Sequence, residues 1–303
     1  MLKNQKFGVE IEFTGITRRK AAGIVAKVLG CTVGSSEGSP YFTRTMIDSQ
    51  NRGWKVMRDS SIVPMRPVGE ASDEYRVEFV TPPLRYEDIE TVQEIVRAFR
   101  KAGAVANHSC GIHIHVDGAN HTAPSLRRLV KFFSARQQLV YEALQVSADR
   151  VNSWCKPVAK SLIDEMAKVK NISRREMETI WYSRANDNYN GRIDHRHYND
   201  TRYHGLNLHS FFSKGTVEFR LFNSTLHAGK IKAYIQFCLA ISAWAIESND
   251  RCSFRDMSSF DARLRRDMMM YILRDKCKMV GAEFATARKW LMEGFETASS
   301  AAA

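Results

Sequence analysis

The sequence lacks any apolar run long enough to cross a membrane. No stretch approaches the roughly 18 consecutive apolar residues of a spanning helix, and the first residues, MLKNQKFGVEIEF, alternate between polar and apolar without a signal-type apolar core. These absences argue against a membrane protein and a secreted one. We therefore expect a soluble, cytoplasmic protein with no membrane partner.

Paired cysteines are also absent. The six cysteines occur singly, without a C-x-x-C spacing, which argues against a structural zinc knuckle or a disulfide framework and predicts free thiols. For Cys110, which precedes Gly111, a catalytic thiol is the alternative to a structural role. No base or oxyanion donor is evident beside it, so we expect a small buried cysteine there.

Proline and glycine are scarce, at 7 and 17 of 303 residues, whereas 44% of the residues are hydrophobic and 26% are charged. This composition is that of a globular protein and excludes a disordered or fibrous chain. Acidic residues are outnumbered 33 to 45 by Lys and Arg, which gives a formal charge of +12. The excess favours acidic partners, with nucleic acid as one alternative. The basic residues are dispersed rather than gathered in an arm, and no DNA- or RNA-binding motif is recognised.

Two periodicities alternate along the chain. A period of two predicts strands at 6–14, 55–58, 76–80, 111–117, 206–211 and 216–222, with a hairpin at 213–215 joining the last two. Helical spacing predicts helices at 17–29, 86–102, 123–146, 157–170, 173–183, 228–248, 260–275 and 281–293. Two polar segments separate these elements, 30–53, with room for a short strand, and 184–205, which has the length of a functional lid.

This order of elements predicts an α+β fold with a mostly antiparallel sheet, helices covering one face and a polar face on the other. We expect a core domain over residues 1–250. A helical C-terminal extension over 251–303 would pack on that core, with a frayed tail at 296–303.

Four of the expected strands carry ionisable side chains on one face and apolar side chains on the other. The ionisable pairs are Glu10/Glu12, Arg76/Glu78, His113/His115 and Glu218/Arg220. Each pair taken alone is more typical of a solvated face or a cross-strand ion pair. Together, three or more carboxylates on adjoining strands would repel one another by several kcal/mol at low dielectric unless a cation lay among them. Glu and His suit Mg²⁺ or Mn²⁺, so the pattern predicts a metal site.

At this point the sequence resembles the amidoligase family, within the superfamily of glutamine synthetase and glutamate–cysteine ligase. The matching segments are FGVEIEF, WKVMRDSSI with EYRVEFVTPPL, CGIHIHVDG, and LNLHSFFSKGTVEFRLFNSTLHAGKI. They occur in the family's order and cover residues 7 to about 240. Each motif is weak alone, whereas the ordered set is specific.

The resemblance implies an ATP- and Mg²⁺-dependent ligase with a glutamine synthetase-like fold, which joins a carboxylate to an amine through an acyl phosphate. Glu10, Glu12, Glu78 and Glu218 then match metal ligands, and His113 matches a ligand of the metal that bridges the phosphates. His115 would lie near the phosphates, and Arg220 would neutralise charge on the transferring phosphoryl group. The expected cofactors are ATP and Mg²⁺ or Mn²⁺, and the substrates are an amino acid, peptide or protein carboxylate and an amine.

Other residues are weaker candidates for substrate or phosphate contacts. Asp59 could bind a metal or amine, with an Asx turn as the structural alternative. Arg76, Arg202 and Asn207 are further candidates for such contacts. His195 and His197 repeat the H-x-H pattern but lie in a polar segment, where an exposed lid is preferred over a metal site.

Three functions remain open from the sequence. The first is the ligase, working on a free amine or with a separate amidotransferase or peptidase partner, because no appended domain of that kind is recognised. The second is a metal-dependent phosphotransferase of the same fold. The third is a basic nucleic-acid-binding protein or metal nuclease, and the residue placement favours the ligase over it.

Overall fold

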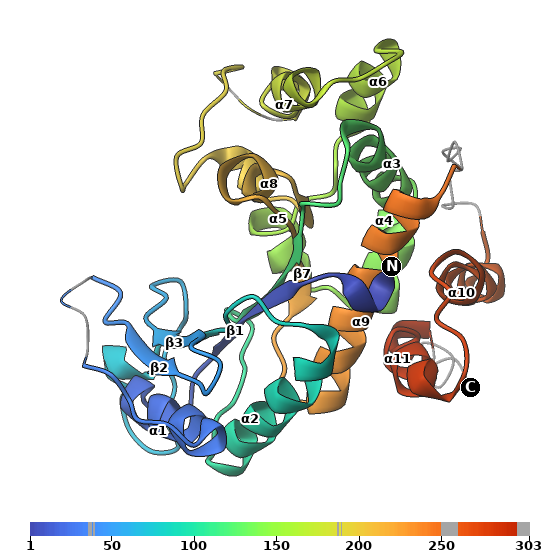
Figure 1. Ribbon diagram of the computed structural model, residues 1–303. Coiled ribbons are helices and arrows are strands. Elements are labelled where there is room, and N and C mark those ends of the chain that lie inside the picture. The colour runs from blue at the N-terminus through green and yellow to red at the C-terminus, as the bar shows by residue number, and fades with distance from the viewer. Residues whose placement is uncertain (36–37, 39, 187, 189, 250–259, 296–303) are drawn as a thin grey trace. The chain divides into compact units, whose positions relative to one another are not determined.

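The computed structural model describes residues 1–35, 38, 40–186, 188, 190–249 and 260–295 (Figure 1). Its strands are β1 (Phe7–Phe13), β2 (Arg44–Ile47), β3 (Gly53–Met57), β4 (Val77–Val80), β5 (Gly111–Asp117), β6 (Leu206–Asn207) and β7 (Thr216–Asn223). They form one sheet in the order β2-β3-β4-β1-β5-β7-β6. The pairs β1–β4, β2–β3, β3–β4 and β6–β7 are antiparallel. The predicted α+β class and mostly antiparallel sheet are confirmed.

The α-helices follow most of the predicted ranges. They are α1 (Arg18–Leu29), α2 (Ile89–Lys101), α3 (Ala123–Ser134), α4 (Gln137–Ala143), α5 (Ala148–Ser153), α6 (Lys160–Lys168), α7 (Arg174–Trp181), α8 (His209–Lys214), α9 (Ala228–Glu247), α10 (Ala262–Tyr271) and α11 (Ala285–Trp290). Short 3₁₀ turns include Arg184–Asn186 and Asp200–Arg202, both within the predicted polar segment 184–205. None of the helices described is long and apolar enough to span a membrane.

The chain divides into two compact units, each described by itself below. The small unit comprises Lys6–Ile114 and Phe222–Ile235, and the large unit comprises Met1–Gln5, His115–Leu221 and Gln236–Ala303. The boundary predicted at residue 250 and the predicted frayed tail at 296–303 fall outside the described residues, so that division stays a prediction.

The core of the small unit lies between its strands and two helices. α1 packs against β2, β3 and α2 (Figure 1). Phe99 of α2 reaches the sheet, with its ring centroid 4.7 Å from that of Phe13 on β1 and 5.4 Å from that of Phe79 on β4. The predicted apolar face is therefore the covered one, and the opposite face is left to the ionisable side chains.

A buried carboxylate fixes the turn between β2 and β3. Asp48 accepts hydrogen bonds from the backbone N–H groups of Gln50 and Arg52, each at 2.9 Å, from Arg52 Nε at 2.8 Å and from Trp54 Nε1 at 2.9 Å. Burial alone would raise the pKa of Asp48, but these hydrogen bonds hold it below its ordinary value. Predicted segment 30–53 thus contains β2 and a specific turn.

The large unit packs α3, α6 and α7 against one another (Figure 1). His121 is buried beside these helices, with Nδ1 3.0 Å from Ser125 Oγ and Nε2 2.9 Å from Ser242 Oγ. Burial, followed by the positive charge of Arg128, lowers the pKa of His121 to about 4. This histidine is therefore a neutral core residue near pH 7.

Two sequence predictions in the large unit were wrong. The helix predicted at 123–146 breaks at Arg136, where φ is −129° and ψ is 0°, into α3 and α4. The apolar stripe continues across the break, from Leu129 and Val130 to Leu139 and Val140, so periodicity alone did not reveal it. The sequence prediction also had no counterpart of α5.

The second error concerns the predicted strand 206–211 and hairpin at 213–215. β6 ends at Asn207, whose side-chain Oδ1 accepts the N–H of His209 at 2.7 Å, and α8 follows. Gly215, with φ of 80°, ends that helix in the left-handed conformation favoured by glycine. β6 and β7 pair as predicted, but a helix rather than a tight turn joins them.

Candidate functional site

Strand register brings the carboxylates of the small unit together. Glu12 on β1 lies directly opposite Glu78 on β4, an antiparallel pairing that places Cβ atoms about 4.5–5.5 Å apart. Both side chains are buried, at 5% and 9% exposure. Like charges that face each other in this way destabilise a sheet unless something neutralises them.

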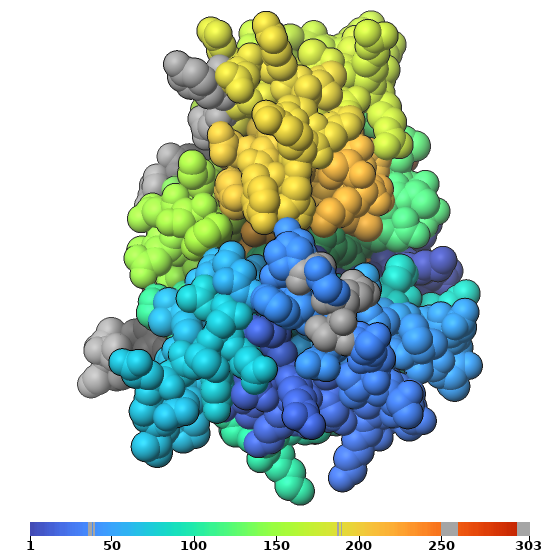
Figure 2. Space-filling view, turned by 90° about the vertical axis from the view of Figure 1, so that its left-hand side faces the viewer, coloured from blue at the N-terminus to red at the C-terminus, as the bar shows by residue number. Residues whose placement is uncertain are grey.

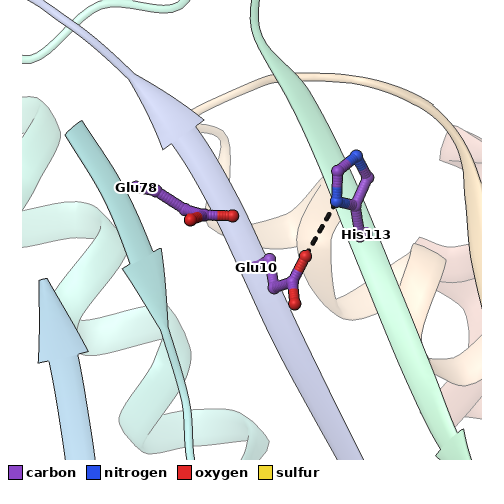
Figure 3. A group of neighbouring side chains, drawn as sticks. All are labelled: Glu10, Glu78 and His113. Carbon is purple, nitrogen blue, oxygen red and sulfur yellow. Dashed lines mark hydrogen bonds and ion pairs between the residues drawn. The ribbon is translucent and has the colours of Figure 1, made fainter. Parts of the chain in front are cut away.

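Glu10 and His113 extend this group (Figure 3). His113 Nδ1 lies 2.9 Å from Glu10 Oε2, and His113 Nε2 lies 3.8 Å from Glu12 Oε1. One ligand atom from each of Glu10, Glu78 and His113 falls within 4.8 Å of the others. Three neighbouring strands therefore point carboxylates and an imidazole toward one another.

Asp59 also joins the carboxylates. Its Oδ1 accepts hydrogen bonds from the backbone N–H and the hydroxyl of Ser61, each at 2.6 Å, which is the turn expected of the structural alternative. Ligand atoms of Asp59, Glu12 and Glu78 nevertheless lie within 4.8 Å of one another. The turn and the cluster thus coexist. We call Glu10, Glu12, Asp59, Glu78 and His113 the acidic cluster.

The acidic cluster fits a divalent cation. Octahedral Mg²⁺ with bonds of about 2.1 Å places its ligand atoms roughly 3.0–4.2 Å apart, so atoms within 4.8 Å need only small side-chain shifts. Two unit charges about 4 Å apart repel by roughly 4 kcal/mol at an effective dielectric near 20, and a bound cation would reverse the sign of that energy. Hard oxygen ligands with one imidazole suit Mg²⁺ or Mn²⁺.

Arg76 does not point into the acidic cluster. Its guanidinium donates to the carbonyl of Ser60, and its Nε lies 3.6 Å from Asp73 Oδ1. Asp73 also pairs with Arg18 and Arg58. The predicted substrate contact of Arg76 stays a prediction, while its geometry is that of an ion-pair network.

The large unit gathers a second group around Glu218 of β7. Asn207 lies opposite Glu218 in the β6–β7 register, and its Nδ2 donates to Glu218 Oε2 at 2.7 Å. Arg220 Nη1 donates to Glu218 Oε1 at 2.5 Å, and His115 Nε2 lies 3.9 Å from the same oxygen. Glu218 and Arg220 are both 4% exposed. We call Glu218, Arg220, Asn207 and His115 the Glu218 cluster.

Hydrogen bonds to neighbouring residues hold members of the Glu218 cluster in place. Arg220 donates its backbone N–H to the carbonyl of Gly205 at 2.8 Å, and its own carbonyl accepts from Arg150 Nη2 at 2.9 Å. A Cβ at Gly205 would collide with the hydroxyl of Tyr141. His115 Nδ1 lies 3.0 Å from Thr216 Oγ1. The backbone of Arg220 and the ring of His115 are thus fixed by contacts within the protein.

A pocket of about 230 Å³ opens beside Glu218. Arg202 and Asn207, both predicted as contacts, line it, together with His209, Ser210 and Lys214. Burial, followed by the charge of Arg202, lowers the pKa of His209 to about 4. His209 was missed by the sequence prediction, although its place two residues after Asn207 could have indicated it.

His195 and His197 are exposed, as expected of the polar segment. His195 Nε2 lies 2.6 Å from Glu178 Oε1, and neither histidine belongs to a metal-ligand group found among the described residues. Cys110 is buried, and its Sγ lies 3.4 Å from Asn107 Oδ1. Both interpretations preferred from the sequence agree with this placement.

Comparison with known proteins places the chain in one family. The family model described as "Putative amidoligase enzyme" matches residues 3–242, which is most of the 303-residue chain. A search of curated proteins finds no match. The matched residues include every member of the acidic cluster and of the Glu218 cluster.

Proposed function

The chain belongs to the amidoligase family, and from that premise we propose that it is an ATP- and Mg²⁺-dependent (or Mn²⁺-dependent) ligase that joins a carboxylate to an amine. The acidic cluster carries the proposal, since its buried carboxylates are the ligands that a phosphate-bound Mg²⁺ uses. We further propose that the sheet is of the glutamine synthetase type.

The reaction requires activation because a carboxylate has no leaving group. In the first step a carboxylate oxygen attacks the γ-phosphorus of ATP, forms an acyl phosphate and releases ADP. In the second step the amine attacks the acyl carbon, phosphate leaves, and the amine proton passes to solvent. Phosphoryl transfer of this kind depends on positioning and on dispersal of negative charge.

The residues of the chain have distinct proposed roles in these steps. Glu10, Glu12, Glu78, His113 and Glu218 would hold the metal ions, which when bound disperse the charge of the phosphates. Arg220 would donate hydrogen bonds to the transferring phosphoryl oxygens, held in the required orientation by Glu218. His115 would lie near the phosphates, and Asp59, Arg202 and Asn207 would contact substrate or phosphate.

The test is release of ADP with Mg²⁺ that requires both a carboxylate and an amine. Glu10→Ala and Glu218→Ala should each abolish it, whereas Glu90→Ala, on the exposed side of α2 and paired with Arg97 at 2.9 Å, should not. Intact turnover in the first two variants would refute the metal assignment. Mass spectrometry of the product separates an amide from a stable phosphorylated compound, which would instead identify a phosphotransferase.

A further inference from the structure

Two basic side chains share the smaller pocket with Glu218. Arg202 and Lys214 line the pocket of about 230 Å³, and in the described part of the chain neither forms an ion pair. Arg202 lies over the rings of Tyr198 and Tyr203, each at 5.6 Å, and its Nη1 donates to the carbonyl of His197 at 2.9 Å. Arg202 is therefore held in position with its charge still available to an anion.

A second, larger pocket of about 1010 Å³ is lined by the neighbouring polar segment. Arg184, Arg192 and Arg196 face it together with Asp194. Asp194 pairs with Arg196 at 2.7 Å, whereas Arg184 and Arg192 have no ion pair among the described residues. Among the described residues that line this pocket, basic side chains therefore outnumber acidic ones.

One stretch of chain, residues 192–197, contributes to the lining of both pockets, and we call it the strap. Arg192, Asp194 and Arg196 line the larger pocket, and His195 and His197 line the smaller one. Figure 2 shows this part of the chain, in yellow, at the molecular surface. The strap therefore presents basic side chains on both of its sides, and one anionic ligand could lie along both pockets.

We propose that the carboxylate substrate is an acidic peptide, whose reacting side chain enters the smaller pocket and whose flanking acidic residues lie in the larger one. A volume of about 230 Å³ is below the roughly 300–1,000 Å³ of pockets for whole drug-sized ligands, which suits one side chain. Among anions, a carboxylate is the one that the proposed ligase consumes. The inference rests on the proposed function for the reaction and adds the substrate class.

Measuring peptide binding in the absence of ATP and metal tests this inference independently of the ligase function. The probe is a blocked hexaglutamate peptide, with blocked hexaglutamine as its uncharged counterpart, measured by titration calorimetry at low salt. Hexaglutamate should bind and hexaglutamine should not. The double variant Arg184→Glu/Arg192→Glu should weaken hexaglutamate binding by at least about tenfold, since it replaces two charge-assisted contacts with repulsion.

Matched variants guard against unfolding and non-specific effects. Arg184→Gln/Arg192→Gln should weaken binding less than the charge reversal, and Arg97→Glu, an exposed change on α2, should leave it unaltered. Thermal unfolding midpoints must match the parent protein. Equal binding of hexaglutamine, or of a hexanucleotide of similar charge, would overturn the proposal, as would unchanged binding after charge reversal.

The two possible failures give different results. If hexaglutamate binds in an arginine-dependent way but never supports ADP release with any amine, the ligase function fails and the peptide site stands. ADP release could instead proceed with a monocarboxylate that carries no other charged group and be unchanged in the arginine variants. In that case the ligase function stands and the acidic-peptide inference fails.

Discussion

The two units carry ionisable groups of opposite character. The acidic cluster of the small unit combines four carboxylates with one imidazole, and the carboxylates of Glu12 and Glu78 face each other. The Glu218 cluster of the large unit surrounds one carboxylate with a guanidinium, an amide and an imidazole. The first arrangement attracts a cation, whereas in the second an arginine neutralises the carboxylate.

Alternation along a β-strand can therefore produce two kinds of site, one suited to a metal ion and one built around an arginine. The same period of two produces Glu-x-Glu on β1 and Glu-x-Arg on β7, and the identity of the second residue takes the formal charge of the pair from −2 to 0. Experiments that alter one group and leave the other intact should therefore separate metal binding from phosphoryl chemistry.

Among the substitutions that separate the two groups, Arg220→Lys has the largest expected effect. The charge is kept, but the planar fork that binds Glu218, and that we propose also binds a phosphoryl group, is lost. We expect kcat for ADP release to fall by about 10³-fold, the lower range for arginines that stabilise phosphoryl transfer, while metal binding to the acidic cluster is unchanged. Steady-state kinetics and metal titration measure the two. A fall in kcat of less than about tenfold would contradict the assigned role.

Glu78→Gln should have the next largest effect and should act on the other side of the comparison. Removing one negative charge relieves repulsion with Glu12 and weakens cation binding. We expect about 100-fold less activity, and loss of the rise in unfolding temperature that Mg²⁺ should give the parent protein. Glu90→Gln on α2 is the matched exposed control. If Mg²⁺ still stabilises the Glu78 variant fully, the acidic cluster is not the cation site.

Asp48→Asn should show what a carboxylate does when protein donors, not a metal, neutralise it. The four hydrogen bonds to Asp48 predict a loss of about 2 kcal/mol in the free energy of unfolding, with or without Mg²⁺. Because the pKa of Asp48 is lowered in the folded state, its stabilisation is present above pH 3.8 and is lost as the pH falls below that value.

Urea unfolding at pH 7 and at pH 3 measures this prediction. Asp164→Asn is its control, since Asp164 is exposed and its ion pair with Lys160 lies on the surface, where such a pair contributes less than about 1 kcal/mol. A Mg²⁺-dependent effect of Asp48→Asn would contradict the distinction between the two kinds of carboxylate.

The smallest expected effect is the pH response of the large unit through His121. Its folded pKa of about 4 lies below the ordinary value of 6.5, so the unfolded chain takes up the proton first. Stability is full above pH 6.5 and falls as the pH drops toward 4, by at most about 1.4 kcal/mol per pH unit. His121→Asn should flatten the unfolding temperature between pH 6.5 and 5.5, and an unchanged slope would refute the assignment.

Much of the sheet could be predicted because its strands alternate strictly. Val9, Ile11 and Phe13 are 1%, 0% and 0% exposed, as the period of two requires when one face packs on helices. The ionisable residues on the opposite face followed automatically. Their mutual placement did not, since the Glu12–Glu78 pairing is a contact between segments that only the register of β1 and β4 determines.

The errors arose where a side chain overrode the local pattern. Residues 206–211 alternate like a strand, but Asn207 binds both Glu218 and the backbone of His209, which ends β6 and begins α8. The role of Asp59 was equally ambiguous, because the same carboxylate caps a turn and lies in the acidic cluster. Such dual contacts depend on distant residues that spacing along the chain does not reveal.

Gly205 is a position from which evolution or design could change the placement of Arg220. The residue has no side-chain functional group, yet its carbonyl accepts a hydrogen bond from the backbone N–H of Arg220. The hydroxyl of Tyr141 fills the space where a side chain would begin. Adding a single methyl group at position 205 would displace either the tyrosine ring or the strand that carries the arginine. The reactivity of the site could therefore be varied from a position that contributes no side chain at all.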